Sequence, residues 1–187
     1  MKKLTTWLFL LVLLQSCTSE EVFYDKELQL ASEMAAIEAY LQDNNLAFNR
    51  HENDFYFKIE DTGNDERVEE DFYVRYHITI YDLYGNFYFS TDESVERSMG
   101  IRITGFGPEL LRYNSPGWWV RLKPVSHLLP MLGVGGKAEF LVPSVNAYGL
   151  RGYQNSIGNS SGVRQIKIAP NTTLRVRMEL ISISEEI

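Results

Sequence analysis

The sequence predicts an α+β domain, and three observations favour this fold class. Several segments alternate apolar and polar residues with a period of two, which is typical of strands in a sheet that has one face in water. Two segments instead repeat apolar residues at the three- and four-residue spacing of a helix. With 187 residues, of which 44% are hydrophobic, the chain is long enough for one substantial core.

Residues 1–16 have the pattern of a secretory signal. Two lysines precede the apolar run Leu4–Leu14, which is too short to cross a hydrocarbon layer of about 30 Å as a stable helix. Cys17, the only cysteine of the chain, follows a small Ser16 and lies three residues after Leu14, a spacing that resembles the bacterial lipobox. We therefore expect removal of residues 1–16 and lipidation of Cys17. The alternative is an unmodified cysteine after an ordinary signal peptide.

A helix is expected directly after this segment, over Lys26–Gln42. Asp25 is available as its N-cap. Four apolar residues share one face of this helix: Leu30, Met34, Ile37 and Leu41. The sequence therefore predicts a tether with a helix over residues 17–53 and the main domain over residues 54–187.

About five strands, mostly antiparallel, are expected in the main domain. In the best-patterned segment, Phe72–Tyr81, the even-numbered positions from Val74 to Ile80 are apolar and form one face. The apolar phase of the last strand changes after Leu180, which indicates a bulge or an exit from the sheet. The candidate strands are Phe55–Ile59, Phe72–Tyr81, Phe87–Phe89, Met99–Ile103, Ala138–Val142 and the segment from Leu174 onward.

Three further segments complete this assignment. Thr104–Trp119 has no periodicity and contains several glycines and prolines, so it is expected to be irregular. Val125–Leu132 has helical spacing and predicts a short helix, with Ser126 as cap and Pro130 in its first turn. Pro143–Thr173 is rich in Gly, Ser and Asn and is expected to be a long loop.

The sequence argues against several classes of chemistry. His51, His77 and His127 are isolated and fit no metal-binding motif, so neither a metal nor a cofactor is expected. A thiol enzyme is not expected either, because Cys17 is expected to carry lipid. The net charge is −7 and no basic run is interleaved with aromatic residues, which argues against nucleic acid as a partner. The expected function is therefore one that needs no ionised catalyst.

Two motifs resemble the FKBP-type peptidyl-prolyl cis-trans isomerases. The first is VGGKAEFLVPS at 134–144, followed by the Ala-Tyr-Gly turn at 147–149, and the second is IAPNTTL at 168–174 before the last strand. Upstream, Val74-Arg75-Tyr76 and GNFYFST at 85–91 are similar to the first long strand and the hairpin of the family. The resemblance covers residues 55–183 and implies an antiparallel sheet wrapped around a short helix. With the leading helix and lipobox, the chain resembles the lipid-anchored members found in Bacteroidetes.

The resemblance also implies an apolar pocket that isomerises the bond before proline. Tyr148 matches the tyrosine whose hydroxyl bonds the substrate carbonyl, and Leu122 matches the aliphatic residue whose backbone N–H meets the substrate. The positions with an implied catalytic role are Tyr76, Tyr88 and Tyr148, and those with an implied substrate-binding role are Leu122, Val125, Ile168 and Val176. For each of them, simple core packing is the alternative interpretation.

The chain departs from the family pattern at two pocket positions. Val125 stands where the family has the tryptophan of the pocket floor, and Phe89 stands where it has an aspartate. Trp118, in the segment before the short helix, is a candidate to replace the missing floor.

The leading hypothesis is an envelope lipoprotein, periplasmic or on the outer-membrane surface, that helps exported proline-containing polypeptides to fold and contacts the membrane through its lipid. The alternative is a lipid-anchored module of the same fold that binds a protein or peptide without catalysis.

Overall fold

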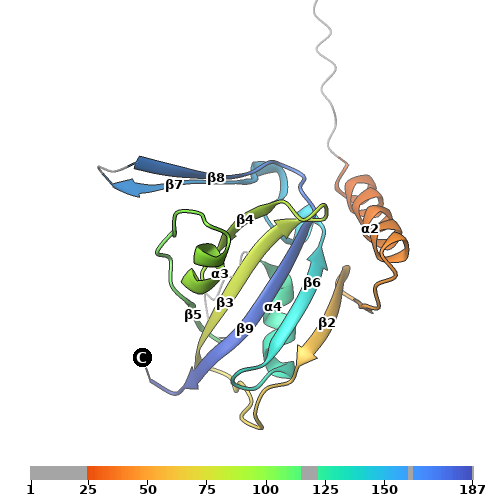
Figure 1. The fold of residues 1–187 in the computed structure, drawn as a ribbon. Helices are drawn as coiled ribbons and strands as arrows, with labels where there is room; N and C mark the ends of the chain where they lie inside the picture. The colour runs from red at the N-terminus through yellow and green to blue at the C-terminus, as the bar shows by residue number, and fades with distance from the viewer. Residues whose placement is uncertain (1–24, 115–121, 160–161, 187) are drawn as a thin grey trace, which may run out of the picture.

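The computed structural model describes residues 25–114, 122–159 and 162–186, and it confirms the α+β class (Figure 1). All strand pairs are antiparallel. The strand order in the main sheet is β1-β2-β6-β9-β3-β4, with β5 paired to β3, and β7 and β8 form a separate two-stranded sheet. The strands are β1 (Asn49–His51), β2 (Phe55–Asp61), β3 (Tyr73–Asp82), β4 (Phe87–Ser90), β5 (Glu109–Arg112), β6 (Lys137–Val142), β7 (Tyr153–Asn159), β8 (Gly162–Ile168) and β9 (Leu174–Ser184). The helices are α2 (Lys26–Asp43), α3 (Glu93–Ser98) and α4 (Lys123–Leu128), with the short 3-10 turns η1 (Leu129–Met131), η2 (Ser144–Asn146) and η3 (Gly149–Arg151).

The two long strands β3 and β9 form the centre of the main sheet. The alternation predicted for β3 is confirmed, because its even-numbered residues from Val74 to Ile80 are buried. The predicted bulge in the last strand is also confirmed. Arg75 lies opposite Ser182 but Tyr76 lies opposite Leu180, so β9 carries one extra residue at this point.

One helix packs on each face of the sheet, α4 on one and α2 on the other. Neighbouring residues of β2 contribute to different clusters, since Phe55 belongs to the core with α4 and Tyr56 to a smaller cluster with α2. This follows from the alternation of side chains along a strand. The N-terminal helix is as predicted, and the Asp25 carboxylate accepts hydrogen bonds from the backbone N–H groups of Glu27 at 2.9 Å and Leu28 at 3.1 Å. No helix within the described ranges is long and apolar enough to span a membrane.

The short helix α4 is real, but its predicted start is wrong. It begins at Lys123, with Pro124 in its first turn, where the absence of an N–H group costs no helical hydrogen bond. Ser126 lies within the helix and does not cap it; its hydroxyl donates to the Lys123 carbonyl at 2.7 Å. Pro130 lies instead at the start of the 3-10 turn η1 that follows.

Three irregular or strand assignments also need correction. The predicted strand Met99–Ile103 is absent, because α3 ends just before it and Gly100, at φ +66°, turns the chain. Thr104–Trp119 contains β5, a four-residue strand. Pro143–Thr173 contains the β7–β8 hairpin, which projects beside β4 in Figure 1. The described strands exceed the predicted number of about five because β5 has only four residues and the β7–β8 hairpin lies in a stretch rich in Gly, Ser and Asn.

Candidate functional site

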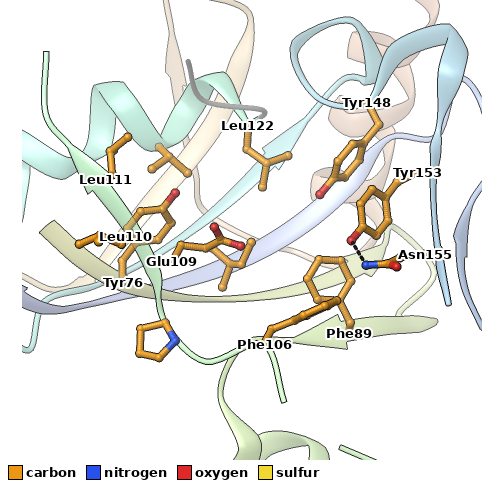
Figure 2. A pocket seen from close by; sticks show the side chains of 13 residues that line it. Tyr76, Phe89, Phe106, Glu109, Leu110, Leu111, Leu122, Tyr148, Tyr153 and Asn155 are labelled. Atoms are coloured by element: carbon orange, nitrogen blue, oxygen red, sulfur yellow. Dashed lines mark hydrogen bonds between the residues drawn. The ribbon is translucent and has the colours of Figure 1, made fainter. Parts of the chain in front are cut away.

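A cavity of about 530 Å³ opens on the α4 face of the main sheet (Figure 2). Its walls come from β3, β4, β5, the start of α4, the Ala-Tyr-Gly turn and the beginning of β7. The described residues that line it are Tyr76, Ile78, Phe89, Phe106, Pro108, Glu109, Leu110, Leu111, Leu122, Val125, Tyr148, Tyr153 and Asn155.

Four of the residues proposed from the sequence meet at this cavity. Tyr76 comes from β3, Leu122 and Val125 from the start of α4, and Tyr148 from the turn after η2. Segments far apart in the chain therefore converge on one hollow.

Three other proposed residues are not among those that line the cavity. Ile168 and Val176 are buried in the main core. Tyr88 is half-buried, and its hydroxyl makes a hydrogen bond with Thr172. Trp118 and Cys17 lie outside the described residues.

The turn that carries Tyr148 is held by backbone contacts on both sides. On its N-terminal side, the Ala147 N–H donates to the Ser144 carbonyl at 2.9 Å. On its C-terminal side, Gly152 has φ +61°, and a Cβ there would come within 2.3 Å of the Ile168 carbonyl oxygen. Only glycine fits this approach, which brings the chain after the turn against the end of β8. Figure 2 shows the Tyr148 hydroxyl directed toward the side of the cavity where Leu122 lies.

Tyr76 contributes a second hydroxyl from the opposite wall. Burial raises its pKa well above the usual range, and the nearby Glu109 and Tyr148 raise it further. The Tyr76 hydroxyl therefore stays protonated at physiological pH and remains a potential hydrogen-bond donor.

Aromatic rings form a continuous wall on the other side of the cavity. The ring of Tyr153 lies 5.1 Å from that of Tyr148 and 5.7 Å from that of Phe89, between centroids. Phe106 meets Phe89 edge-on at 5.5 Å. Asn155 donates to the Tyr153 hydroxyl at 3.2 Å and so helps to hold the ring in place. Rings in mutual contact offer a ligand an apolar surface.

Sequence reasoning missed the part of the site that comes from Phe106–Leu111 and from Tyr153 and Asn155. Both segments fall in stretches that the sequence predicts to be irregular. The available signal was the group of large apolar side chains between Phe106 and Leu111, which is unusual for a solvated loop. The four residues of β5 are too few to show a period of two.

Val125 and Phe89, the two positions at which the sequence departs from the pattern that it resembles, both lie at the cavity. Each is nearly fully buried and lines it, and Phe89 belongs to the aromatic wall. Within the described ranges, no group of three or more His, Cys, Asp or Glu residues is placed to hold a metal ion.

The architecture is that of the FKBP-type peptidyl-prolyl isomerases. The chain is similar to the crystal structure of FkpA from Escherichia coli, with a TM-score of 0.54 and 18% sequence identity, covering 84% of this chain and 62% of that one. A peptidyl-prolyl cis-trans isomerase from Pseudomonas syringae gives a TM-score of 0.52 at 16% identity, covering 86% of this chain and 97% of that one. The structure of AtFKBP13 gives 0.51 at 19% identity, covering 73% and 98% of the two chains.

Comparison by sequence finds no counterpart. No protein-family model matches the chain, and no curated protein matches it. At identities below 20%, the three solved structures establish the FKBP fold.

Proposed function

We propose that the protein is a peptidyl-prolyl cis-trans isomerase whose site is the cavity bounded by Tyr76, Leu122 and Tyr148. The observation that carries this proposal is an aromatic-walled hollow with tyrosine hydroxyls on two sides, at the site where sequence motifs and fold converge.

The chemistry matches what such a hollow can do. Rotation about an X-Pro bond has a barrier of about 18–20 kcal/mol, because the resonance of the amide is lost in the twisted state. The twisted amide is less polar than the planar one, so contact with the aromatic and aliphatic walls of the cavity favours it. A hydroxyl donor such as that of Tyr148 can hold the carbonyl oxygen as it turns. Catalysis then consists of binding the twisted state more tightly than either planar isomer, with no acid, base or metal required.

The setting we propose for this activity is the cell envelope. The signal-like segment and Cys17 support export followed by lipid anchoring. Proline-containing segments of exported polypeptides that are still folding are the substrates that such a location offers.

The test is the rate of cis-to-trans conversion in a proline tetrapeptide, measured with and without the purified chain. Uncatalysed conversion takes tens to hundreds of seconds at 25 °C, so acceleration is easily seen. We expect acceleration by the wild type and a large loss in Tyr148→Ala. Tyr84→Ala is the control, because Tyr84 is 93% exposed and lies outside the cavity. No acceleration above background by the wild type would overturn the proposal.

A second candidate function is peptide binding without catalysis on the same fold. The replacement of the family tryptophan by Val125 and of the aspartate by Phe89 favours it, because both changes lie in the cavity. Binding of the tetrapeptide with no change in its isomerisation rate would favour this alternative.

A further inference from the structure

One residue of the cavity has a charge that the proposed reaction does not use. Glu109 is the only charged residue among the described residues that line the cavity. It lies on β5 directly opposite Tyr76 of β3. Its position two residues before the buried Leu111 places both on the same side of the strand, facing the α4 side of the sheet. Figure 2 shows its carboxylate in the middle of the site, between Tyr76 and the aromatic wall.

The Glu109 carboxylate has no countercharge among the residues that the structure describes. It makes none of the ion pairs or side-chain hydrogen bonds found there, and two arginines of β5 and β8 pair with other carboxylates. Arg112 of the same strand pairs with Asp71 at 3.5 Å, and Arg164 of β8 pairs with Glu96 at 2.8 Å. The side chain is exposed, so the carboxylate is in contact with solvent.

The surroundings of this carboxylate suit a cation. A Lys or Arg side chain that enters beside a bound proline finds Glu109 as a charge partner, and aromatic faces such as those of Phe106 and Tyr153 attract cations as well. An acidic side chain in the same place meets a like charge, and none of the described residues that line the cavity carries a positive charge to offset this repulsion. Charge complementarity of this kind mainly determines which partners bind.

We propose that Glu109 is a specificity-determining residue that makes the cavity select proline segments with a Lys or Arg next to the proline. This inference rests on the proposed function, since it assumes that the cavity holds an X-Pro segment. It narrows the substrate class to basic proline-containing polypeptides.

The experiment uses three tetrapeptides of the form Ala-X-Pro-Phe, in which X is lysine, norleucine or glutamate. For each peptide, kcat/KM for isomerisation and the Kd for binding are measured with the purified full chain. We expect kcat/KM for the lysine peptide to be about threefold to fivefold higher than for the norleucine peptide, which is the effect of one solvent-exposed ion pair. The glutamate peptide is expected to be the poorest, and added salt should reduce all the differences.

Variants of Glu109 assign the preference to this residue. In Glu109→Gln, the ratio of kcat/KM for the lysine peptide to that for the norleucine peptide should fall to near one. In Glu109→Lys, the order should invert, so that the glutamate peptide has the highest kcat/KM and the lysine peptide the lowest. Glu60→Gln is the matched control, because Glu60 is an exposed glutamate of β2 that does not line the cavity and has no ion pair among the described residues. It removes the same charge from the whole molecule and should keep the wild-type ratio.

The outcomes separate this inference from the proposed function. Equal kcat/KM and Kd for the three peptides, with isomerisation intact, would overturn the inference alone. Preferential binding of the lysine peptide without any acceleration would overturn the proposed catalysis and support the role of Glu109. If the peptides are neither bound nor isomerised, both the proposed function and this inference are overturned. If Glu109→Gln keeps the preference for the lysine peptide, another group causes that preference and the inference is overturned.

Discussion

At the scale of single residues, Tyr148 contributes to the site in two ways that can be tested separately. Tyr148 contributes a ring to the aromatic wall, where it lies against Tyr153, and a hydroxyl on the side of the cavity where Leu122 lies. Tyr148→Phe keeps the ring and removes only the hydroxyl. Because one hydrogen bond contributes about 1 kcal/mol, we expect kcat/KM to fall about fivefold to tenfold.

The Tyr148→Ala variant removes the ring as well and should lose more activity than Tyr148→Phe. Both variants are measured with the norleucine tetrapeptide, so that Glu109 does not contribute a charge preference. Unchanged activity in Tyr148→Phe would limit this residue to a packing role.

A second residue-scale effect concerns His127 at the end of α4. Its ring lies 4.9 Å from that of His51, between centroids. Burial, and next the neighbouring His51, lower the pKa of His127 below its ordinary value of 6.5. The folded state therefore binds a proton at this site less readily than the unfolded chain does.

This pKa shift predicts a loss of stability in acid. As pH falls through 6.5, the unfolded chain takes up a proton at this position while the folded chain resists it, so the free energy of unfolding decreases. His127→Asn should show a weaker decrease over roughly pH 7 to 5, measured by urea unfolding at a series of pH values. Above neutral pH, the free energies of unfolding of the two proteins should change with pH in parallel. Equal slopes of this free energy against pH below 6.5 would contradict the prediction.

At the scale of elements, the buried Glu96 of α3 connects three parts of the fold. Its carboxylate accepts hydrogen bonds from the backbone N–H groups of Ser90 in β4 and Thr104 in the following loop. It also pairs with Arg164 of β8, whose guanidinium donates to the Tyr88 carbonyl at 2.6 Å. The β7–β8 hairpin is thereby attached to the strand that carries Phe89 in the cavity wall.

Two glutamates of α3 make a matched test of this connection. Glu96→Ala leaves the half-buried Arg164 unpaired and should cost about 3–5 kcal/mol in unfolding free energy. Glu93→Ala removes only the exposed pair with Arg97 and should cost less than about 1 kcal/mol. Urea denaturation of both variants measures the difference, and similar small losses would show that the buried pair does not hold the hairpin.

The elements that sequence reasoning found and missed differ in a physical way. β3 is ten residues long and has one buried face, so its alternation is visible in the sequence. β5 has four residues, and the β7–β8 hairpin forms a sheet of its own that adds only a few apolar side chains to the main core, so neither shows a long apolar period. α3 is a six-residue polar helix held by its Asp92 cap and by Glu96. Such elements depend on tertiary contacts that a local pattern does not contain.

The same reasoning applies to the site. Tyr76, Leu122, Val125 and Tyr148 were identified through motif resemblance, and the structure brings them to one cavity. Phe106, Glu109 and Tyr153 lie in segments without a motif, and only the pairing of β5 with β3 and the course of the hairpin place them there.

At the scale of the whole molecule, the N-terminal helix is packed onto the folded sheet. Ile37 is 0% exposed, and α2 also contributes the buried Glu33, whose carboxylate accepts a 2.6 Å hydrogen bond from the Ser144 N–H. That contact lies four residues before Tyr148, so α2 supports the segment that leads into the site. Ile37→Ala should cost about 2–5 kcal/mol by leaving a cavity under the helix.

Leu28→Ala is the control on the same helix. Leu28 is 69% exposed, so the variant should change the unfolding free energy by no more than about 0.5 kcal/mol. Thermal or urea unfolding measures both variants. Equal, small effects would mean that α2 contributes little to the stability of the fold.

The last prediction concerns how the whole molecule is held in the envelope. An acyl chain on Cys17 would contribute about 0.8 kcal/mol of membrane affinity per buried CH₂ group. The chain from Cys17 onward has 16 basic and 25 acidic residues, a net charge of −9, so it has no electrostatic attraction to an anionic leaflet. We therefore expect cells that express the protein to incorporate a labelled fatty acid into the wild type and into Ser19→Ala, but not into Cys17→Ala. The wild type should stay in the membrane fraction after a high-salt wash, because salt does not weaken an apolar anchor. Equal labelling of Cys17→Ala, or release of the wild type by salt, would contradict lipid attachment at this cysteine.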